Sequence, residues 1–167
     1  MKKIETEYKF IVEKPSMDTL RNQKSFSKSD ITQIYLQDEN MTHRVRKRVY
    51  ENERTEYTEN TKIRISKLSS IENEREISEN EFLALSKNIE NGSNVLKKTR
   101  CAVEYEGKIF EFDFYDMWEK TCIMEVELDS ESENFTTPQF VNVIKDVTGD
   151  KSYSNHSMAH KFPDEII

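Results

Sequence analysis

The beginning of the chain alternates charged and aromatic side chains at the two-residue period of a β-strand. Glu5, Glu7 and Lys9 occupy every second position. Tyr8 lies between Glu7 and Lys9, and Phe10 follows Lys9. Because successive side chains of a strand point to opposite faces, the three charges share one face and the two rings share the other. Such a strand packs its apolar face into a core and presents a row of charges on the opposite side.

The same alternation recurs further along the chain. We expect eight strands, near residues 3–11, 31–37, 42–50, 54–65, 71–78, 97–105, 108–116 and 121–128. Glu106-Gly107 separates two alternating runs and is expected to turn a hairpin. Eight antiparallel strands are the number at which a barrel closes around one small ligand. We therefore predict a single α+β domain over residues 1–167, dominated by mostly antiparallel strands.

Helices are expected between and after these strands. Pro15-Ser16 opens a helix that ends near Phe26. Ser78 and Glu81 have capping-box spacing and predict a helix over about residues 79–90. Thr137-Pro138 resembles an N-cap with proline in the first turn and predicts a helix to about residue 146. A last short helix is expected after residue 155.

Composition excludes several classes of protein. The chain is 34% charged with a formal net charge of −7, an acidic balance that argues against general nucleic-acid binding. It has no apolar run long enough to span a membrane and no apolar signal region at its N-terminus. Cys101 and Cys122 lie on apolar strand faces, which indicates buried free thiols in a reducing compartment. We expect a cytoplasmic protein.

Charges of opposite sign are concentrated on different strands. Basic residues on shared faces are Arg44, Arg46, Lys62, Lys98 and Arg100, and acidic ones are Glu72, Glu74, Glu125 and Glu127. A solvated sheet face with cross-strand ion pairs is one explanation. The segregation favours another, in which the basic strands bind an anion and the acidic strands bind a divalent cation.

These segments together resemble the CYTH superfamily, also called triphosphate tunnel metalloenzymes. Glu5-Thr6-Glu7-Tyr8-Lys9 matches the ExExK signature of that superfamily. Its other motifs follow in order along the chain. They are Arg44-Val45-Arg46 (RxR), Thr61-Lys62 (TxK), Glu72-Asn73-Glu74 with Ile77 (ExExxI), Lys98-Thr99-Arg100 (KxR), Glu125-Val126-Glu127-Leu128 (ExEL) and residues 147–155 (VTGDxxYSN).

The resemblance implies an eight-stranded antiparallel β-barrel that forms a tunnel, with helices packed outside, and metal-dependent chemistry on a triphosphate. It implies Mg²⁺ or Mn²⁺ as the cofactor, and a small-molecule triphosphate as the partner. By this resemblance Glu5, Glu7, Glu125 and Glu127 are the metal ligands. One of Glu72 and Glu74 orients or deprotonates the attacking water and the other holds a second metal. Lys9 braces the first carboxylates or reaches a terminal phosphate. The expected phosphate-binding residues are Arg44, Arg46, Lys62, Lys98, Arg100 and Lys151.

Several alternatives stay open at this level. The leading hypothesis is a hydrolase of inorganic triphosphate or of a small organic triphosphate. A class IV adenylate cyclase and a non-catalytic polyphosphate- or nucleotide-binding module are the others. Tyr35, Tyr57 or Trp118 would be needed to stack on an organic group. The sequence leaves open whether Glu72, Glu74 or Glu76 face the tunnel, and whether the protein is a homodimer.

One histidine pair stands apart from these motifs. His156 and His160 are four residues apart in a predicted helix, a spacing known from transition-metal sites. No cysteine or third histidine lies beside them in the sequence, so the pair alone does not predict a metal site.

Overall fold

The structure is a computed structural model that describes residues 2–166, and it is built around one antiparallel sheet. The strands are β1 (Lys2–Glu13), β2 (Lys24–Tyr35), β3 (Thr42–Tyr50), β4 (Thr55–Arg64), β5 (Ser69–Glu76), β6 (Leu96–Tyr105), β7 (Lys108–Phe114), β8 (Thr121–Leu128) and β9 (Val143–Asp146). The helices are α1 (Met17–Arg21), α2 (Glu79–Ser86) and α3 (Asn155–His160), with a 3-10 helix η1 (Lys151–Tyr153). Within this part of the chain, no helix is long and apolar enough to cross a membrane.

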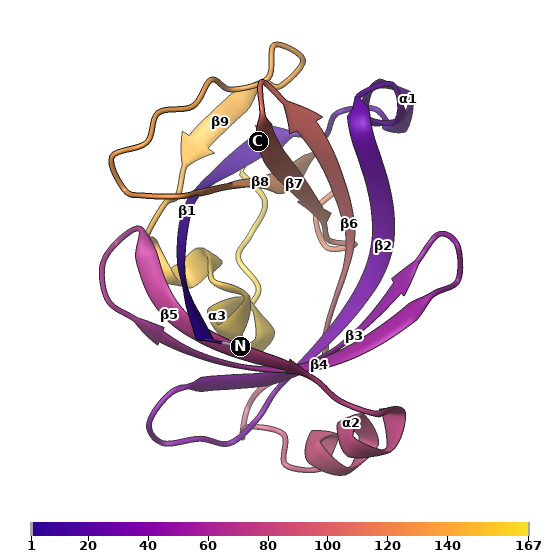
Figure 1. The fold of residues 1–167 in the computed structure, drawn as a ribbon, viewed down its shortest axis with the longest axis vertical. Coiled ribbons are helices and arrows are strands. Elements are labelled where there is room, and N and C mark those ends of the chain that lie inside the picture. Colours follow the sequence, from indigo (N-terminus) through magenta and orange to yellow (C-terminus); the bar gives the residue numbers. More distant parts are fainter. Residues whose placement is uncertain (1, 167) are drawn as a thin grey trace.

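The first strand closes the sheet into a barrel (Figure 1). One edge of β1 pairs with β8 along residues 6–13, and the start of its other edge pairs with β5, where Ile4 lies opposite Ile71. Beyond residue 6 this second edge leaves β5, and β9 then pairs with it opposite residues 10–12. The eight-stranded antiparallel barrel that the resemblance implies is therefore confirmed, with β9 as an additional short strand.

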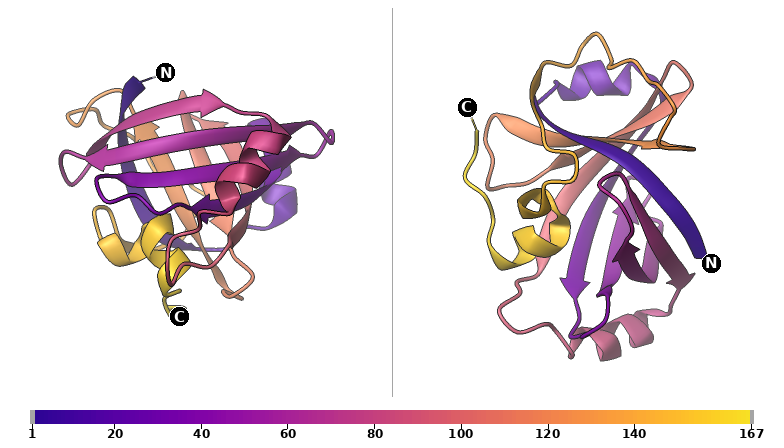
Figure 2. Two further views of the ribbon diagram at one scale, coloured as in Figure 1. Left: turned by 90° about the horizontal axis from the view of Figure 1, so that it is seen from below. Right: turned by 90° about the vertical axis from the view of Figure 1, so that its left-hand side faces the viewer.

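Apolar residues pack mainly outside the barrel. The outward faces of β1, β6, β7 and β8 form one buried cluster with Leu20 of α1. A second cluster lies between the outward faces of β2–β4 and α2, with Ile77 just after β5, and α2 crosses these strands in the left view of Figure 2. Because the apolar faces are covered from outside, the inward faces are free to carry charge.

A third apolar cluster fills one end of the barrel. Ile11 and Ile123 continue the inward-facing rows of β1 and β8, and they pack with Trp118, Tyr153 and Met158. Helix α3 thus lies at the barrel end rather than on its outer face.

Local sequence signals explain several element ends. Glu106 and Gly107 have φ of 48° and 77°, the backbone that a two-residue hairpin turn needs, so the predicted hairpin is confirmed. Ser78 accepts a hydrogen bond from the Glu81 backbone at 3.1 Å, and Glu81 accepts one from the Ser78 backbone at 2.8 Å. The predicted capping box therefore opens α2, which ends at Ser86 and not near residue 90.

The predictions are wrong in two stretches of the chain: one has shifted bounds, and the other lacks the expected helix. The helix expected to reach Phe26 ends at Arg21, and β2 begins at Lys24 and not near residue 31. No helix follows Thr137-Pro138. Instead, the Val141 backbone donates a hydrogen bond to the Pro138 carbonyl, and the turn that this bond closes leads into β9. In both places, pairing with a neighbouring strand, β6 or β1, outweighs the local helix signal.

Candidate active site

The barrel encloses a cavity of about 480 Å³, which we call the hollow. Inward-facing positions of β1–β8 line it, together with the segment that follows β9. All the site residues predicted from the sequence except Lys98 line the hollow. They are Glu5, Glu7, Lys9, Arg44, Arg46, Lys62, Glu72, Glu74, Arg100, Glu125, Glu127 and Lys151.

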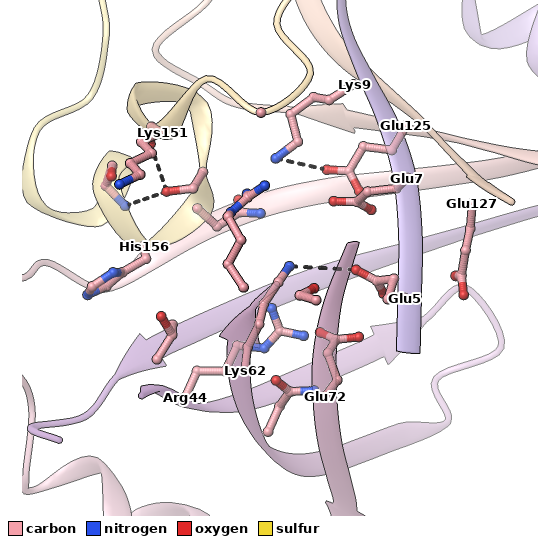
Figure 3. A pocket seen from close by; sticks show the side chains of 18 of the residues that line it. Glu5, Glu7, Lys9, Arg44, Lys62, Glu72, Glu125, Glu127, Lys151 and His156 are labelled. Atoms are coloured by element: carbon pink, nitrogen blue, oxygen red, sulfur yellow. Dashed lines mark hydrogen bonds and ion pairs between the residues drawn. The ribbon is translucent and has the colours of Figure 1, made fainter. Parts of the chain in front are cut away.

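One side of the hollow carries carboxylates, which we call the acidic wall: Glu5 and Glu7 of β1, Glu72 of β5 and Glu125 of β8 (Figure 3). Burial raises the pKa of Glu7 well above its usual range, and the nearby charges of Glu125 and Glu5 raise it further. Burial and a hydrogen bond with Glu72 also raise the pKa of Glu5. Crowded carboxylates that lack sufficient positive charge are unstable as anions, so this wall favours a bound cation.

Glu125 differs from its neighbours because cations of the chain hold it. Its carboxylate lies 3.6 Å from Lys9 Nζ and 3.8 Å from Arg100 Nη2. Burial raises the pKa of Glu125, but the charges of Lys9 and Arg100 outweigh burial and lower it to about 2. Lys9 also donates a hydrogen bond to the Tyr153 carbonyl at 3.2 Å. Lys9 therefore fixes Glu125 against the segment that follows β9.

Arg44 and Arg46 of β3, on the inward face of the barrel, form the basic wall of the hollow. Among the residues that the structure describes, none accepts a hydrogen bond from Nε of either arginine, although both atoms are buried. Burial lowers the pKa of Arg46 to about 9, and the nearby charges of Arg44 and Arg100 act in the same direction. Buried guanidinium groups with unmet donors favour an anionic ligand.

Lys62 of β4 reaches across to the acidic wall. Its Nζ lies 3.6 Å from Oε1 of Glu5, as Figure 3 shows. Lys62 therefore lies where a bound cation and a bound anion would meet. Glu74, which lies on the same face of β5 as Glu72, also lines the hollow and accepts a hydrogen bond from Asn60 at 3.4 Å.

A buried ion network supports the wall from behind. Asp113 of β7 accepts hydrogen bonds from Arg100 Nε at 2.7 Å, from Arg100 Nη2 at 2.8 Å and from Lys98 Nζ at 2.8 Å. Burial lowers the pKa of Lys98 to about 7, although Asp113 opposes the shift. Lys98 faces inward but lies in this network and not on the surface of the hollow, so it positions Arg100 and Asp113.

Two predicted residues lie at the margin of the hollow. Glu127 is 47% exposed at its side chain and pairs with Lys3 at 3.3 Å. Lys151 belongs to η1 and is exposed.

The register of β5 also answers the question left open by the sequence: Glu72 and Glu74 line the hollow, and Glu76 is exposed outside it.

The sequence offered Tyr35 as one of three candidate aromatic residues for the site, but it did not predict that α3 lines the hollow. Tyr35, Asn155 and His156 all line the hollow. Asn155 Oδ1 accepts hydrogen bonds from Tyr115 at 2.6 Å and from Lys98 at 3.4 Å. The VTGDxxYSN match includes Asn155 and was the available signal for it. Tyr35 faces inward because it alternates with Ile34, which packs outside the barrel. Predicting this position requires the full extent of β2.

The donor set of the acidic wall fits a hard divalent cation. Oxygen ligands from carboxylates suit Mg²⁺ and Mn²⁺. Burial, and after it the neighbouring carboxylates, raise the pKa of Glu5 and of Glu7, so a bound cation would stabilise their charged forms. Glu125 is already paired with Lys9 and Arg100, so Glu5, Glu7 and Glu72 are the better ligands.

Comparisons with known proteins agree with the fold. No protein-family model and no curated protein matches this chain. It is similar to the solved structure of the inorganic triphosphatase NE1496, with 25% identity, 95% of this chain and 99% of that chain covered, and a TM-score of 0.59.

Two archaeal structures show the same fold at lower identity. The PH1819 protein from Pyrococcus horikoshii OT3 is 19% identical over 74% of this chain and 80% of that one, with a TM-score of 0.54. A conserved hypothetical protein from Pyrococcus furiosus is 18% identical over 77% and 80%, with a TM-score of 0.51.

Proposed function

We propose, from the CYTH-superfamily fold and signature residues of this chain, that it is a metal-dependent hydrolase of inorganic triphosphate. One observation carries the proposal: within the described residues, the hollow has guanidinium groups with unmet Nε donors on one wall and buried, crowded carboxylates on another. Arg44 and Arg46 have buried donors with no acceptor among residues 2–166, while Glu5 and Glu7 are crowded by other carboxylates. A polyanion bound together with a divalent cation satisfies both walls at once.

The basic wall would bind the phosphates. Arg44 and Arg46 present planar guanidinium groups that donate paired hydrogen bonds to phosphate oxygens, and Lys62 adds a mobile point charge. Arg100, fixed by Asp113, extends this surface toward Glu125. Such contacts position the substrate and neutralise its charge, which is most of what phosphoryl transfer requires.

The acidic wall would hold Mg²⁺ or Mn²⁺ through Glu5, Glu7 and Glu72, with Glu125 and Glu127 nearby. Such a cation would neutralise the charge of the phosphate oxygens and so make the phosphorus atom more susceptible to attack by water. Because Glu72 faces Glu5, we assign Glu72 to the cation and Glu74 to the orientation of the attacking water. Lys9 holds Glu125 in place. Cys101 and Cys122 are buried in the outer apolar cluster, away from this chemistry.

The lining of the hollow favours an inorganic triphosphate over a nucleotide or thiamine triphosphate. Trp118 is 1% exposed and packs with Tyr115 and Phe162 in the barrel-end cluster. Tyr57 packs on Phe82 beneath α2. Among the phenylalanine, tyrosine and tryptophan residues in the described part of the chain, Tyr35 alone lines the hollow. Tyr35 packs against His156 with ring centroids 5.1 Å apart, so within residues 2–166 this one pair is the aromatic surface that the lining offers to a base or a thiazolium ring.

A substrate panel tests the proposal. Triphosphate, pyrophosphate, ATP and thiamine triphosphate are incubated with Mg²⁺, with Mn²⁺ and without a divalent cation, and phosphate, pyrophosphate and cyclic AMP are measured separately. We expect cation-dependent release of phosphate and pyrophosphate from triphosphate. Cyclic AMP from ATP would instead establish the cyclase. Tight triphosphate binding without any release would establish the binding module.

A pair of substitutions on β1 tests the acidic wall. Glu7→Gln should lower kcat/KM for triphosphate by about a hundredfold or more, because a cation ligand supplies several kcal/mol of charge stabilisation. Glu13→Gln is the matched control: Glu13 lies on the same strand and face but is exposed beyond the hollow. Circular dichroism checks that both variants fold. Equal rates for Glu7→Gln and the wild type would remove the acidic wall from the mechanism.

A further inference from the structure

Three potential metal ligands converge beside α3, outside the acidic wall. His156 Nε2 lies 2.9 Å from Oε1 of Glu90, and His160 Nε2 contacts the same oxygen. One ligand atom from each of the three residues lies within 4.8 Å of the others. The two imidazole rings meet edge to face, with centroids 5.3 Å apart. The sequence showed the two histidines, but only the fold adds the carboxylate, which lies 66 residues from His156.

The backbone around this cluster is fixed on both sides. The Glu90 backbone donates a hydrogen bond to the Tyr35 carbonyl at 2.9 Å, which joins it to the end of β2. Asn94 donates from its backbone and from its side chain to the Ala159 carbonyl, at 2.8 and 3.2 Å. The loop that carries Glu90 and the helix that carries both histidines are therefore held together by groups other than the three ligands.

We propose that Glu90, His156 and His160 form a binding site for a divalent transition metal of the zinc class. Zinc takes imidazole nitrogen at about 2.0–2.1 Å and carboxylate oxygen at about 2.0–2.2 Å, which in a tetrahedron places ligand atoms about 3.3 Å apart. The three atoms here need only small side-chain rotations to reach that spacing. Two nitrogen ligands and one oxygen favour Zn²⁺ over Mg²⁺.

The cluster is accessible to an ion from solvent. The side chains of His156, His160 and Glu90 are 36%, 33% and 19% exposed. Three protein ligands leave a fourth tetrahedral position for water. The site is separate from the acidic wall in both ligands and chemistry, and it does not depend on the proposed triphosphatase activity.

The position of the site gives it a structural consequence. His156 lines the hollow and packs against Tyr35 with ring centroids 5.1 Å apart, while Glu90 is anchored to β2. A metal at this site links α3, which fills the barrel end, to the barrel strand β2. Zn²⁺ should therefore raise the thermal unfolding midpoint of the protein, because it binds the folded state alone.

The test uses Zn²⁺ calorimetry in excess Mg²⁺, so that the acidic wall is occupied, and Co²⁺ absorption as a spectroscopic probe. His160→Gln removes a ligand that does not line the hollow. His43→Gln is the matched control, because His43 lies on β3 beside Glu59, away from the cluster. We expect one Zn²⁺ per wild-type chain, an affinity lower by more than about tenfold in His160→Gln, and no loss in His43→Gln.

A second variant guards against a purely local effect. Glu90→Gln should reduce Zn²⁺ affinity and the visible Co²⁺ bands as His160→Gln does, and both variants should keep the circular dichroism spectrum of the wild type. Equal Zn²⁺ affinity in the wild type, His160→Gln and Glu90→Gln would overturn the site. So would a wild type that binds no Zn²⁺ under these conditions.

Discussion

Replacing Asp113 with asparagine should destabilise the barrel more than any substitution in the hollow itself. The carboxylate has no exposed side-chain surface and accepts three charge-assisted hydrogen bonds, two from Arg100 and one from Lys98. Burial raises the pKa of Asp113, but the charges of Arg100 and Lys98 outweigh burial and place the pKa well below its usual range. The residue is therefore an anion at any ordinary assay pH.

The size of the effect follows from what Asp113→Asn leaves behind. The amide keeps one oxygen acceptor but loses the charge, so Arg100 loses its fully buried partner and keeps only Glu111 at 3.0 Å and Glu125 at 3.8 Å. Asp113 also raises the pKa of Lys98, which is about 7 in the wild type, so its removal lowers that pKa further. Breaking a buried ion pair by removing one partner costs about 3–5 kcal/mol. For a chain of this length, that loss lowers the thermal midpoint by roughly 6–20 °C.

Urea titration and thermal melts measure this loss directly. The control is Asp30→Asn, which removes an exposed carboxylate that accepts one hydrogen bond from Thr99 at 2.8 Å. We expect the control to change stability by less than about 0.5 kcal/mol. A free energy of unfolding for Asp113→Asn within about 1 kcal/mol of the wild type would refute the reasoning, because removing the fully buried partner of an ion pair has to cost more than that.

Two further predictions concern groups outside the hollow. Glu165 accepts hydrogen bonds from the backbones of Glu119, Lys120 and Thr121; burial raises its pKa, but these bonds and the Thr121 hydroxyl lower it to about 2. Its stabilisation is therefore complete above the unfolded pKa of about 4.3 and is lost as the pH falls through about 2. Glu165→Gln should melt below the wild type at pH 7, and the gap should close in acid; a gap that does not change with pH would contradict this. Burial raises the pKa of Cys101 to about 11. Alkylation followed by mass spectrometry should therefore find this thiol unmodified in the folded protein and modified after unfolding, whereas fast native labelling would contradict its burial.

The alternation of charge and apolar residues predicted the interior of the barrel well. On β1, Glu5, Glu7 and Lys9 face inward while Phe10 packs outside, as the period of two requires. This worked because each strand has one outward face that must be buried, which fixes its register. The distinction between Lys98, behind the surface of the hollow, and Arg100, on that surface, could not be predicted. It depends on side-chain geometry around Asp113.

Predictions failed where a local signal competed with an unpaired strand edge. Thr137-Pro138 reads as a helix start, yet Val143 pairs with Val12 on the edge of β1 that β5 leaves free. An exposed strand edge carries unpaired backbone groups, so covering it outweighs a modest helix preference. Contacts between segments far apart in the sequence could not be predicted either. Glu90 joins the two histidines, and Glu165 joins the β7–β8 turn, only because the chain has folded.

The placement of apolar clusters outside the strands separates two properties that most small proteins mix. Outward side chains such as Tyr8 and Phe10 determine how firmly the shell holds together. Inward ones such as Glu5 and Glu7 determine what the lumen attracts. Neighbouring residues on one strand therefore serve either ligand binding or packing. Substitutions at lining positions such as Glu5 and Glu7 can change the ligand without altering the outer apolar clusters.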